Sequence, residues 1–172
     1  MKNVGKDFEQ QFQDSLKTCG LKVLRLPDPP QSFNKQTNTM LRFSNKNPYD
    51  FEAFLSPHLY CLELKSTQGT SISVQRELTS KTHSIKTHQI NGLKNASIYH
   101  NVYAGFIFNF RTAARTYWMS INQFLSFIDN SDKKSINEKD IQQFGGIIIA
   151  QELKQKKYNF NIQQWLNEIC SK

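Results

Sequence analysis

The chain has 172 residues and a net charge of +8, from 22 Lys and Arg against 14 Asp and Glu. This length suits one domain with its own hydrophobic core, so we expect residues 1–172 to form a single domain. The positive charge favours a polyanionic partner, and nucleic acid is the first candidate. A basic protein without such a partner remains the alternative.

Three cysteines, Cys19, Cys61 and Cys170, are far apart and form no CxxC pair. This spacing argues against a disulfide framework and against a thiolate zinc site, and it fits a reducing cytoplasm. The first residues contain no apolar segment of the signal-peptide type. The longest apolar runs have the length of a strand, so we expect a cytoplasmic protein without a membrane span.

The first predicted element is a helix over about residues 5–18. Phe8, Phe12 and Leu16 recur at every fourth position and therefore lie on one helical face. A strand over 21–26 follows it.

Residues 27–48 differ in character from their surroundings. The segment opens with three prolines in four residues and continues with many Asn, Gln, Thr and Ser residues. Long segments of this kind inside a compact domain are usually functional or disordered. We therefore expect an insertion between core elements, either a flexible loop or a projecting hairpin.

The remaining elements follow from hydrophobic runs, helical periodicity and capping residues. We expect strands over 49–55, 59–65, 102–110, 116–119 and 147–149, helices over 86–99, 120–128, 135–144 and 161–169, and a loop over 69–84. This order predicts one mixed α/β domain.

Two carboxylates and a lysine converge on the first predicted hairpin. A tight turn at residues 56–57 places Asp50 opposite Glu63, and residues opposed on one face lie about 5 Å apart. Side chains alternate along a strand, so Glu63 and Lys65 share that face. The three side chains are therefore expected to meet, although they come from separate parts of the chain.

Such a trio has the chemistry needed to hydrolyse a phosphodiester. Neighbouring carboxylates repel one another unless they share a cation, and Mg²⁺ binds to one or two carboxylates, water and substrate phosphate. The metal polarises the phosphate and activates water, and a lysine stabilises the developing charge. The alternative to a catalytic site is a surface hairpin that carries a Glu–Lys pair on its solvent-exposed face. The preceding acid, the apolar strand and the basic chain favour the catalytic interpretation.

These residues resemble the PD-(D/E)xK nucleases and, among them, the RecU-type Holliday junction resolvases. The resemblance covers residues 5–166 and includes a compact, phage-encoded variant among its implications. The matching motifs are Asp50 followed by Glu63-Leu64-Lys65, Gly5-Lys6-Asp7-Phe8-Glu9 in the first helix, Ile85-Lys86-Thr87-His88-Gln89 before the second, and the apolar strand that ends at Arg111. The approach to the first acid, Pro48-Tyr49, departs from the usual Thr-x pattern.

The resemblance implies a role for each residue of the site. Asp50 and Glu63 hold the metal together with the Leu64 carbonyl, and Lys65 faces the phosphate. The metal is Mg²⁺, for which Mn²⁺ is expected to substitute.

Further residues are implied around this trio. Glu9 and Gln89 reach the catalytic region from the first and second helices. A solvated helix carboxylate is an equal alternative for Glu9. Glu52 shares the face of Asp50 and is a candidate additional ligand.

A DNA-binding surface is implied by basic residues on the insertion and around the site. Phosphate contacts position a protein on DNA, and bases stack on aromatic side chains. Each residue has a solvated surface charge, or for histidine a structural role, as its alternative. The candidates are Lys35, Arg42, Lys46, Arg76, Lys81, Lys86 and His88.

The implied fold is a restriction-endonuclease-like α/β core, with a central mixed sheet flanked by helices and a projecting, stalk-like insertion. The implied function is resolution of four-way DNA junctions in recombination and repair, in a bacterial or phage-infected cell. Paired incisions suit a homodimer, with Phe106, Phe108 and Phe110 or the Trp118 strand as candidate interfaces. The alternatives are a sequence-specific or repair nuclease and a non-catalytic DNA-binding module.

Overall fold

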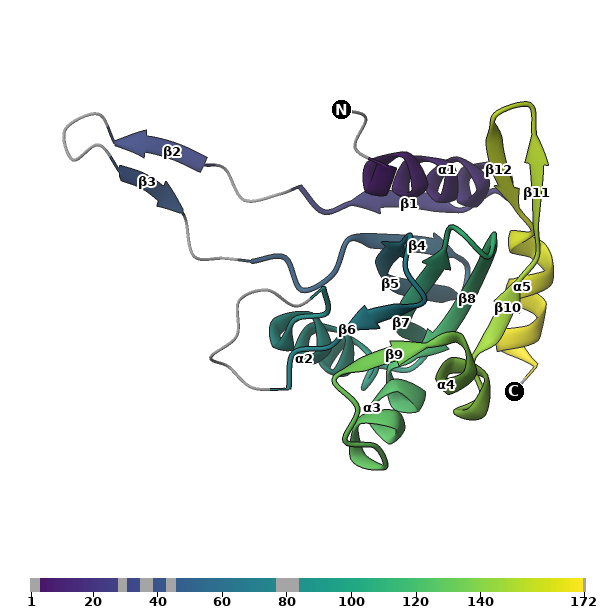
Figure 1. Cartoon of the computed structure of the whole chain (residues 1–172). Helices are drawn as coiled ribbons and strands as arrows, with labels where there is room; N and C mark the ends of the chain where they lie inside the picture. The colour runs from purple at the N-terminus through teal and green to yellow at the C-terminus, as the bar shows by residue number, and fades with distance from the viewer. Residues whose placement is uncertain (1–3, 28–30, 35–38, 43–45, 77–83, 172) are drawn as a thin grey trace.

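The computed structural model describes residues 4–27, 31–34, 39–42, 46–76 and 84–171 (Figure 1). The helices are α1 (Val4–Thr18), α2 (Thr87–Ala96), α3 (Ile121–Asp129), α4 (Glu138–Gln143) and α5 (Ile162–Cys170). The strands are β1 (Lys22–Arg25), β2 (Gln31–Asn34), β3 (Thr39–Arg42), β4 (Phe51–Leu55), β5 (His58–Thr67), β6 (Ser71–Ser73), β7 (Val102–Phe110), β8 (Arg115–Ser120), β9 (Ser135–Asn137), β10 (Ile147–Ile149), β11 (Gln151–Lys154) and β12 (Lys157–Phe160).

A six-stranded mixed sheet forms the centre, in the order β1-β4-β5-β7-β8-β10. Strand β5 runs parallel to β7, and the other neighbours are antiparallel. The parallel pair needs a crossover, which α2 supplies. The expected mixed α/β architecture is therefore confirmed.

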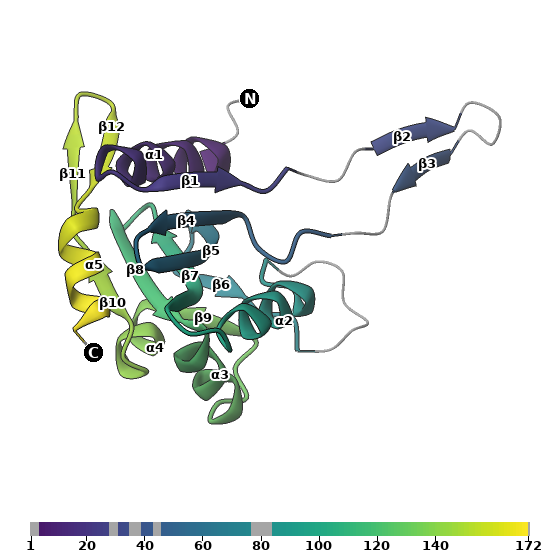
Figure 2. The same cartoon turned by 180° about the vertical axis from the view of Figure 1, so that it is seen from behind.

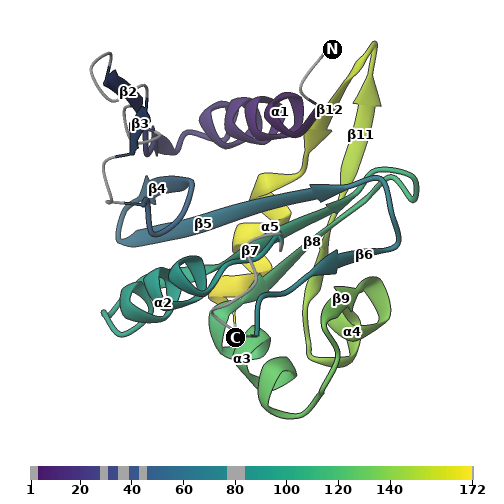
Figure 3. The same cartoon turned by 60° about the vertical axis from the view of Figure 1, so that its left-hand side comes forward.

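Helix α1 lies on one face of this sheet, and α2 and α3 lie on the other (Figure 3). A hydrophobic cluster fills the space on each face. Alternation along β5 divides its side chains between the two clusters. Tyr60, Leu62 and Leu64 pack towards α1 and α5, whereas Cys61 joins the cluster formed with α2 and α3. Glu63 and Lys65 continue the Cys61 side, so the candidate catalytic residues of β5 lie on the face that α2 covers.

Two antiparallel strands, β2 and β3, occupy the predicted insertion. Figure 1 and Figure 2 show this hairpin projecting away from the central sheet. Its base is closed by hydrogen bonds, because the Leu26 N–H donates to the Asp50 carbonyl at 2.9 Å. The Asn47 side-chain amide donates to the Leu26 carbonyl at 3.2 Å and to the Pro27 carbonyl at 2.6 Å. The two ends of the insertion are thereby held together.

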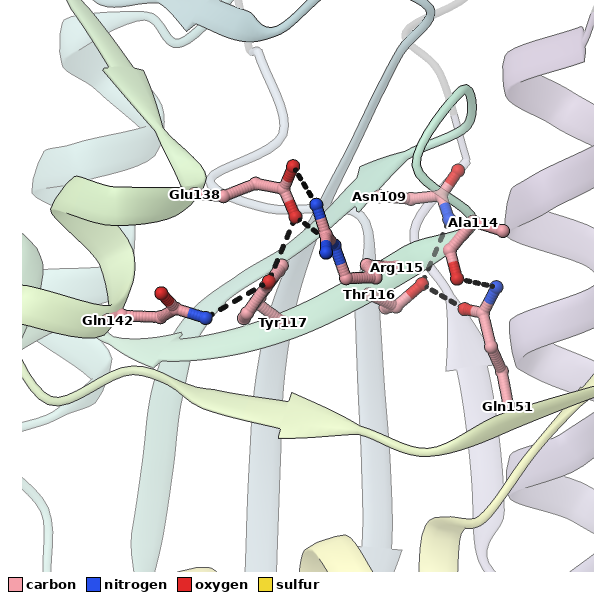
Figure 4. Close-up of polar contacts among 8 residues, drawn as sticks. All are labelled: Asn109, Ala114, Arg115, Thr116, Tyr117, Glu138, Gln142 and Gln151. Atoms are coloured by element: carbon pink, nitrogen blue, oxygen red, sulfur yellow. Dashed lines mark hydrogen bonds and ion pairs between the residues drawn. The ribbon is translucent and has the colours of Figure 1, made fainter.

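A polar network ties α4 and β11 to strand β8 (Figure 4). The Arg115 Nε and the Tyr117 hydroxyl donate to the Glu138 carboxylate at 2.6 and 2.9 Å. The Thr116 hydroxyl accepts from the Asn109 amide and donates to the Gln151 carbonyl oxygen. The hydrogen bond from Arg115 lowers the pKa of Glu138. These polar groups satisfy one another, so we assign them a structural role.

Three expectations about the chain after residue 68 are wrong, and one hairpin was not predicted. Residues 69–84 are not only loop, because β6 pairs with β9 and buries Ile72 against Ile136. Residues 135–144 begin with strand β9 before α4, and the hairpin β11–β12 was not predicted because its first strand is largely exposed and polar. The proposed interface residues are core residues instead: Phe106, Phe108, Phe110 and Trp118 are all buried within the chain.

Helix α2 approaches the segment before Asp50 very closely at Gly92. A Cβ atom at residue 92 would lie 2.4 Å from the Pro48 Cβ and 2.6 Å from the Pro48 carbonyl oxygen. The second contact is with backbone, which cannot rotate away. Glycine at this position therefore lets α2 pack against the segment that presents Asp50.

We predict that Gly92→Ala destabilises the protein by about 1–3 kcal/mol, because the added methyl group overpacks this contact. In an open helix the same substitution stabilises by about 1 kcal/mol, so the sign is diagnostic. The measurement is the free energy of unfolding in urea. Asn91→Ala, at an exposed position of the same helix, is the control and should change stability little. A stabilised Gly92→Ala variant would contradict the close contact.

Candidate functional site

The register of β4 and β5 is the predicted one. Phe51 pairs with Leu62 and Leu55 with His58. Asp50 precedes β4 and is not paired with Glu63 in this register, because its N–H donates to the carbonyl of Leu62, the partner of Phe51, at 3.1 Å. The Asp50 carboxylate then accepts the Leu64 N–H at 2.9 Å through Oδ2. Asp50 is thus fixed beside the stretch of β5 that carries Glu63 and Lys65.

The Leu64 carbonyl faces this same edge of β5. In a strand, the N–H and C=O of one residue point towards the same neighbouring strand. The Leu64 N–H points towards Asp50 at the place where β4 has not yet begun. Its carbonyl oxygen is therefore directed to the Asp50 side, as the predicted role of Leu64 requires.

Glu63 is the most deeply buried acidic residue of the site, with 1% of its surface exposed. Its Oε1 atom pairs with the Lys65 Nζ at 2.6 Å and accepts a hydrogen bond from the Gln89 Nε2. Its Oε2 atom is buried and has no hydrogen-bond partner among the residues that the structure describes. Leaving a buried carboxylate oxygen without a partner is costly, so this atom is suited to a cation.

Gln89 is oriented by the N-terminus of α2. Its Oε1 atom accepts the Lys86 backbone N–H at 3.0 Å, and this bond leaves its Nε2 atom to donate to Glu63. The side chain thus caps the helix and contacts the buried carboxylate at once. The motif that suggested Gln89 carried no information about this double role.

Burial raises the pKa of the Glu63 carboxyl to about 7. The charges of Asp50 and Glu9 raise this pKa further, whereas the Lys65 ammonium lowers it. A second cation at the carboxylate would act in the same direction as Lys65 and favour the ionised form.

Glu9 reaches the site from α1, on the other side of the sheet. Its carboxylate lies 3.3 Å from the Arg25 guanidinium of β1. It also lies close enough to Glu63 to raise the pKa of that residue. Arg25 was not singled out in the sequence, where no local pattern distinguishes it from other basic residues.

Glu52 has a defined partner. The buried Tyr49 donates its hydroxyl hydrogen to the Glu52 Oε1 at 2.8 Å. Together with burial, this contact raises the pKa of the Tyr49 hydroxyl. Glu52 therefore orients the residue that precedes Asp50, and its additional role as a ligand stays a prediction.

Three cations gather around His88 near the N-terminus of α2. Burial lowers the pKa of the His88 imidazole, and the charges of Lys46, Lys86 and Lys65 lower it further. Lys46 and Lys86 are exposed. This group of His88, Lys46, Lys65 and Lys86 forms a basic rim beside the carboxylates.

Among the described side chains, the other predicted DNA contact, Arg76, has a structural role. Arg76 donates to three backbone carbonyls, those of Ile128, Ser131 and Lys133, and stacks over Phe127, so its guanidinium holds the chain after α3. Arg42 is the last residue of β3. Lys35 and Lys81 lie outside the described residues.

The donor set at the site fits a hard divalent cation. The described part of the chain contains no group of three or more His, Cys, Asp or Glu side chains that could hold a metal ion. Two carboxylates and a carbonyl are available instead, which is the oxygen-rich, incomplete set to which Mg²⁺ adds water and substrate phosphate. The Oε2 atom of Glu63, which no described residue contacts by a hydrogen bond, supports this fit.

We predict that Glu63→Gln changes how stability depends on pH in the presence of a chelator. The folded-state pKa is raised from 4.5 to about 7, so the stabilising contribution of the proton is complete below pH 4.5 and lost as pH rises through 7. The wild type should therefore lose roughly 3 kcal/mol relative to Glu63→Gln between pH 4.5 and 8.

Denaturant unfolding at a series of pH values measures this difference. Glu152→Gln is the control, because that side chain is 71% exposed and should leave the pH profile unchanged. Parallel profiles for wild type and Glu63→Gln would contradict the burial of an ionisable carboxylate.

The fold resembles that of a known DNA-processing protein. The solved structure of Hjc, a Holliday junction resolvase from the archaeon Archaeoglobus fulgidus, matches with a TM-score of 0.53 and 12% sequence identity, over 84% of this chain and 95% of that chain. The expected restriction-endonuclease-like fold, a mixed sheet flanked by helices, is thereby confirmed. No helix in the described residues is long and apolar enough to cross a membrane.

Sequence comparison gives a closer relative. No model of a protein family matches the chain. The SPbeta prophage-derived uncharacterized protein YotM of Bacillus subtilis (strain 168) is 30% identical over 176 residues, which cover 98% of this chain and 85% of that protein. The chain therefore belongs to the family of this prophage protein.

Proposed function

We propose that this protein is a metal-dependent endonuclease that resolves four-way DNA junctions. The observation that carries the proposal is the Glu63 carboxylate, which is buried beside Asp50 and bonded to Lys65 and Gln89 through one oxygen. Its other oxygen has no hydrogen-bond partner within the described ranges of the chain. Similarity of fold to a Holliday junction resolvase supports the choice of substrate.

Each residue has a chemical task in this proposal. Asp50, Glu63 and the Leu64 carbonyl hold a divalent cation, Mg²⁺ or Mn²⁺, which polarises the scissile phosphate and acidifies a water when bound. Lys65 places its ammonium beside Glu63 and stabilises charge that develops on the phosphate. Gln89 keeps the Glu63 carboxylate in one orientation, since its own amide is fixed by the Lys86 N–H.

The enzyme interpretation accounts for the burial better than a binding module does. A DNA-binding surface needs exposed cations, which Lys46 and Lys86 of the basic rim supply without Glu63. Burying a carboxylate costs several kcal/mol, and a protein that only binds DNA gains nothing from this cost. Residues at functional sites commonly carry pKa values perturbed by burial and neighbouring charge.

The substrate class is the finer part of the proposal. The basic rim of Lys46, Lys65, Lys86 and His88 contacts phosphates, and the projecting insertion, with Arg42 at the end of β3 and Lys35 in the same segment, enters the branch point. A homodimer supplies two active sites for paired incisions. The whole chain acts as one nuclease domain with a stalk at 27–48, as a RecU-type resolvase from a phage or bacterium would.

We predict Mg²⁺- or Mn²⁺-dependent cleavage of a synthetic four-way junction, with the matched linear duplex largely spared. Asp50→Asn and Lys65→Ala should lower the cleavage rate by a hundredfold or more, at least about 3 kcal/mol of transition-state stabilisation, while junction binding persists. Gel assays of cleavage and of binding in chelator measure the two effects separately.

Lys139→Ala, at an exposed position of α4, is the control and should cut at the wild-type rate. Equal cutting of junction and duplex would leave a general or repair nuclease in place of a resolvase. Wild-type activity in Asp50→Asn would remove the proposed site.

We also predict that the metal stabilises the fold, because it binds the folded carboxylates and not the unfolded chain. At a Mg²⁺ or Mn²⁺ concentration about 100 times Kd, the gain is about 2.7 kcal/mol. Thermal unfolding with and without the metal measures it, and Asp50→Asn should abolish the gain. An equal gain in Asp50→Asn would place the metal elsewhere.

A further inference from the structure

A cavity of about 180 Å³ lies on the α1 side of the sheet, where strand β7 ends. Helix α1, the end of β7 and the hairpin β11–β12 form its walls. The lining includes two opposite charges, two aromatic rings and two amides: Asp7, Phe8, Asn109, Arg111, Gln151 and Tyr158. None of the roles derived so far uses this cavity or Arg111.

Arg111 brings an unsatisfied hydrogen-bond donor to the cavity. Its backbone N–H donates to the Thr67 carbonyl at 2.9 Å, which fixes the residue at the end of the sheet. Its Nε atom is buried and has no hydrogen-bond partner among the residues that the structure describes. A buried donor without an acceptor is costly. An acceptor atom of a ligand in the cavity would remove this cost.

The charges in the described lining favour an uncharged ligand. Arg111 contributes one positive charge and Asp7 one negative charge. A phosphate would be attracted by the guanidinium and repelled by the carboxylate. A neutral group that carries an acceptor and a donor side by side satisfies both residues. A nucleobase has such an edge, and in guanine the O6 acceptor lies next to the N1–H donor.

The size and the aromatic surface of the cavity also suit a base. Pockets for drug-sized ligands measure about 300–1,000 Å³, so this smaller cavity suits one base and not a whole nucleotide. Phe8 and Tyr158 contribute aromatic rings to the lining. Stacking on an aromatic ring is the usual way in which proteins hold an unpaired base.

The walls of the cavity are fixed by hydrogen bonds. The Asn109 amide donates to the Thr116 hydroxyl, which in turn donates to Gln151, as Figure 4 shows. The Tyr158 N–H donates to the Gln11 Oε1 at 2.7 Å and attaches the hairpin to α1. Walls that are ordered before the ligand binds reduce the entropic cost of binding.

One hydrogen bond connects the cavity to the strand that carries the catalytic lysine. The Ser66 hydroxyl donates to the Asn109 Oδ1 at 3.0 Å, and Ser66 directly follows Lys65. Because side chains alternate along a strand, Lys65 and Ser66 lie on opposite faces of the sheet. The cavity and the catalytic lysine therefore lie at the same end of β5. A DNA strand with a phosphate at Lys65 can turn a nearby base into the cavity.

We propose that this cavity binds one unstacked base of the strand that is cut, with a preference for guanine, and that Arg111 and Asp7 are its hydrogen-bonding partners. The proposal rests on the proposed nuclease function and deepens it, because it adds a contact that depends on base identity. Extrusion of a base costs least where its pairing is already weakened, as at a branch point.

Abasic sites, placed one at a time near the cleavage position, test the proposal through junction binding in chelator, where no cleavage occurs. At one position the wild type should lose about tenfold in affinity, the effect of one stacked base. Arg111→Met should bind the intact junction about tenfold more weakly and lose nothing further at this position. Lys139→Met, at an exposed position of α4, is the control and should keep the tenfold loss. Equal losses in the wild type and Arg111→Met at every position would overturn the proposal.

Asp7→Asn distinguishes a base from a phosphate. At the position found with abasic sites, the wild type should bind guanine about fivefold or more tightly than adenine, and Asp7→Asn should lose most of this preference. If the cavity holds a phosphate instead, removal of the negative charge should tighten binding for every base, and the proposal fails. Asp14→Asn, at an exposed position of the same helix, is the control and should keep the preference.

The two levels of the proposal fail in different ways. A wild type that cuts junctions but shows neither a sensitive position nor a preference for guanine refutes the role of the cavity alone. A wild type that neither binds nor cuts DNA refutes the proposed function together with it.

Discussion

The burial of the Glu63 carboxylate constrains everything around it. An ionised group removed from water must be compensated by partners, or it takes up a proton. Lys65 and Gln89 compensate one of its oxygens, and the position of each follows from that demand. Lys65 can contact Glu63 because it lies two residues further along β5, on the same face of the strand. Gln89 can contact Glu63 because α2 begins close to β5 and Gln89 lies in the first turn of this helix. The other oxygen has no hydrogen-bond partner among the described residues, and in the proposed function a metal ion takes this place.

This demand explains the architecture of the sheet near the site. Strand β4 begins only at Phe51, so no β4 residue is paired with Leu64. The Asp50 carboxylate accepts the hydrogen bond from the Leu64 N–H instead. Glu9, from the opposite layer, lies close enough to Glu63 to raise the pKa of that carboxyl. Gly92 lets α2 come close to the segment that carries Asp50. The close packing of α2 at Gly92 therefore helps to set the position of the Asp50 carboxylate.

The features that the sequence predicted correctly are those that depend on residues close together in the chain. The turn between β4 and β5 predicted their register correctly from Leu55–His58 to Phe51–Leu62, which leaves Asp50 beside the stretch of β5 that carries Glu63, and periodicity located the helices. Contacts between elements that are distant in the sequence could not be predicted from it. The pairing of Arg25 with Glu9 depends on how α1 lies on the sheet, and Arg76 was judged by its charge although three carbonyls bind it. Short polar strands such as β6 and β11 carry too weak a pattern to be recognised.

The closed base of the insertion has an evolutionary consequence. Leu26 and Asp50 are hydrogen-bonded to one another, and Asn47 reinforces the same junction. A segment whose ends are pinned together can lengthen, shorten or be replaced while the geometry beyond the pin stays constant, since each doubling of loop length costs only about 0.6 kcal/mol. Relatives can thus exchange this hairpin for one of another size without disturbing Asp50. Under the proposed function, a change in this hairpin would then alter target choice separately from the chemistry at Asp50.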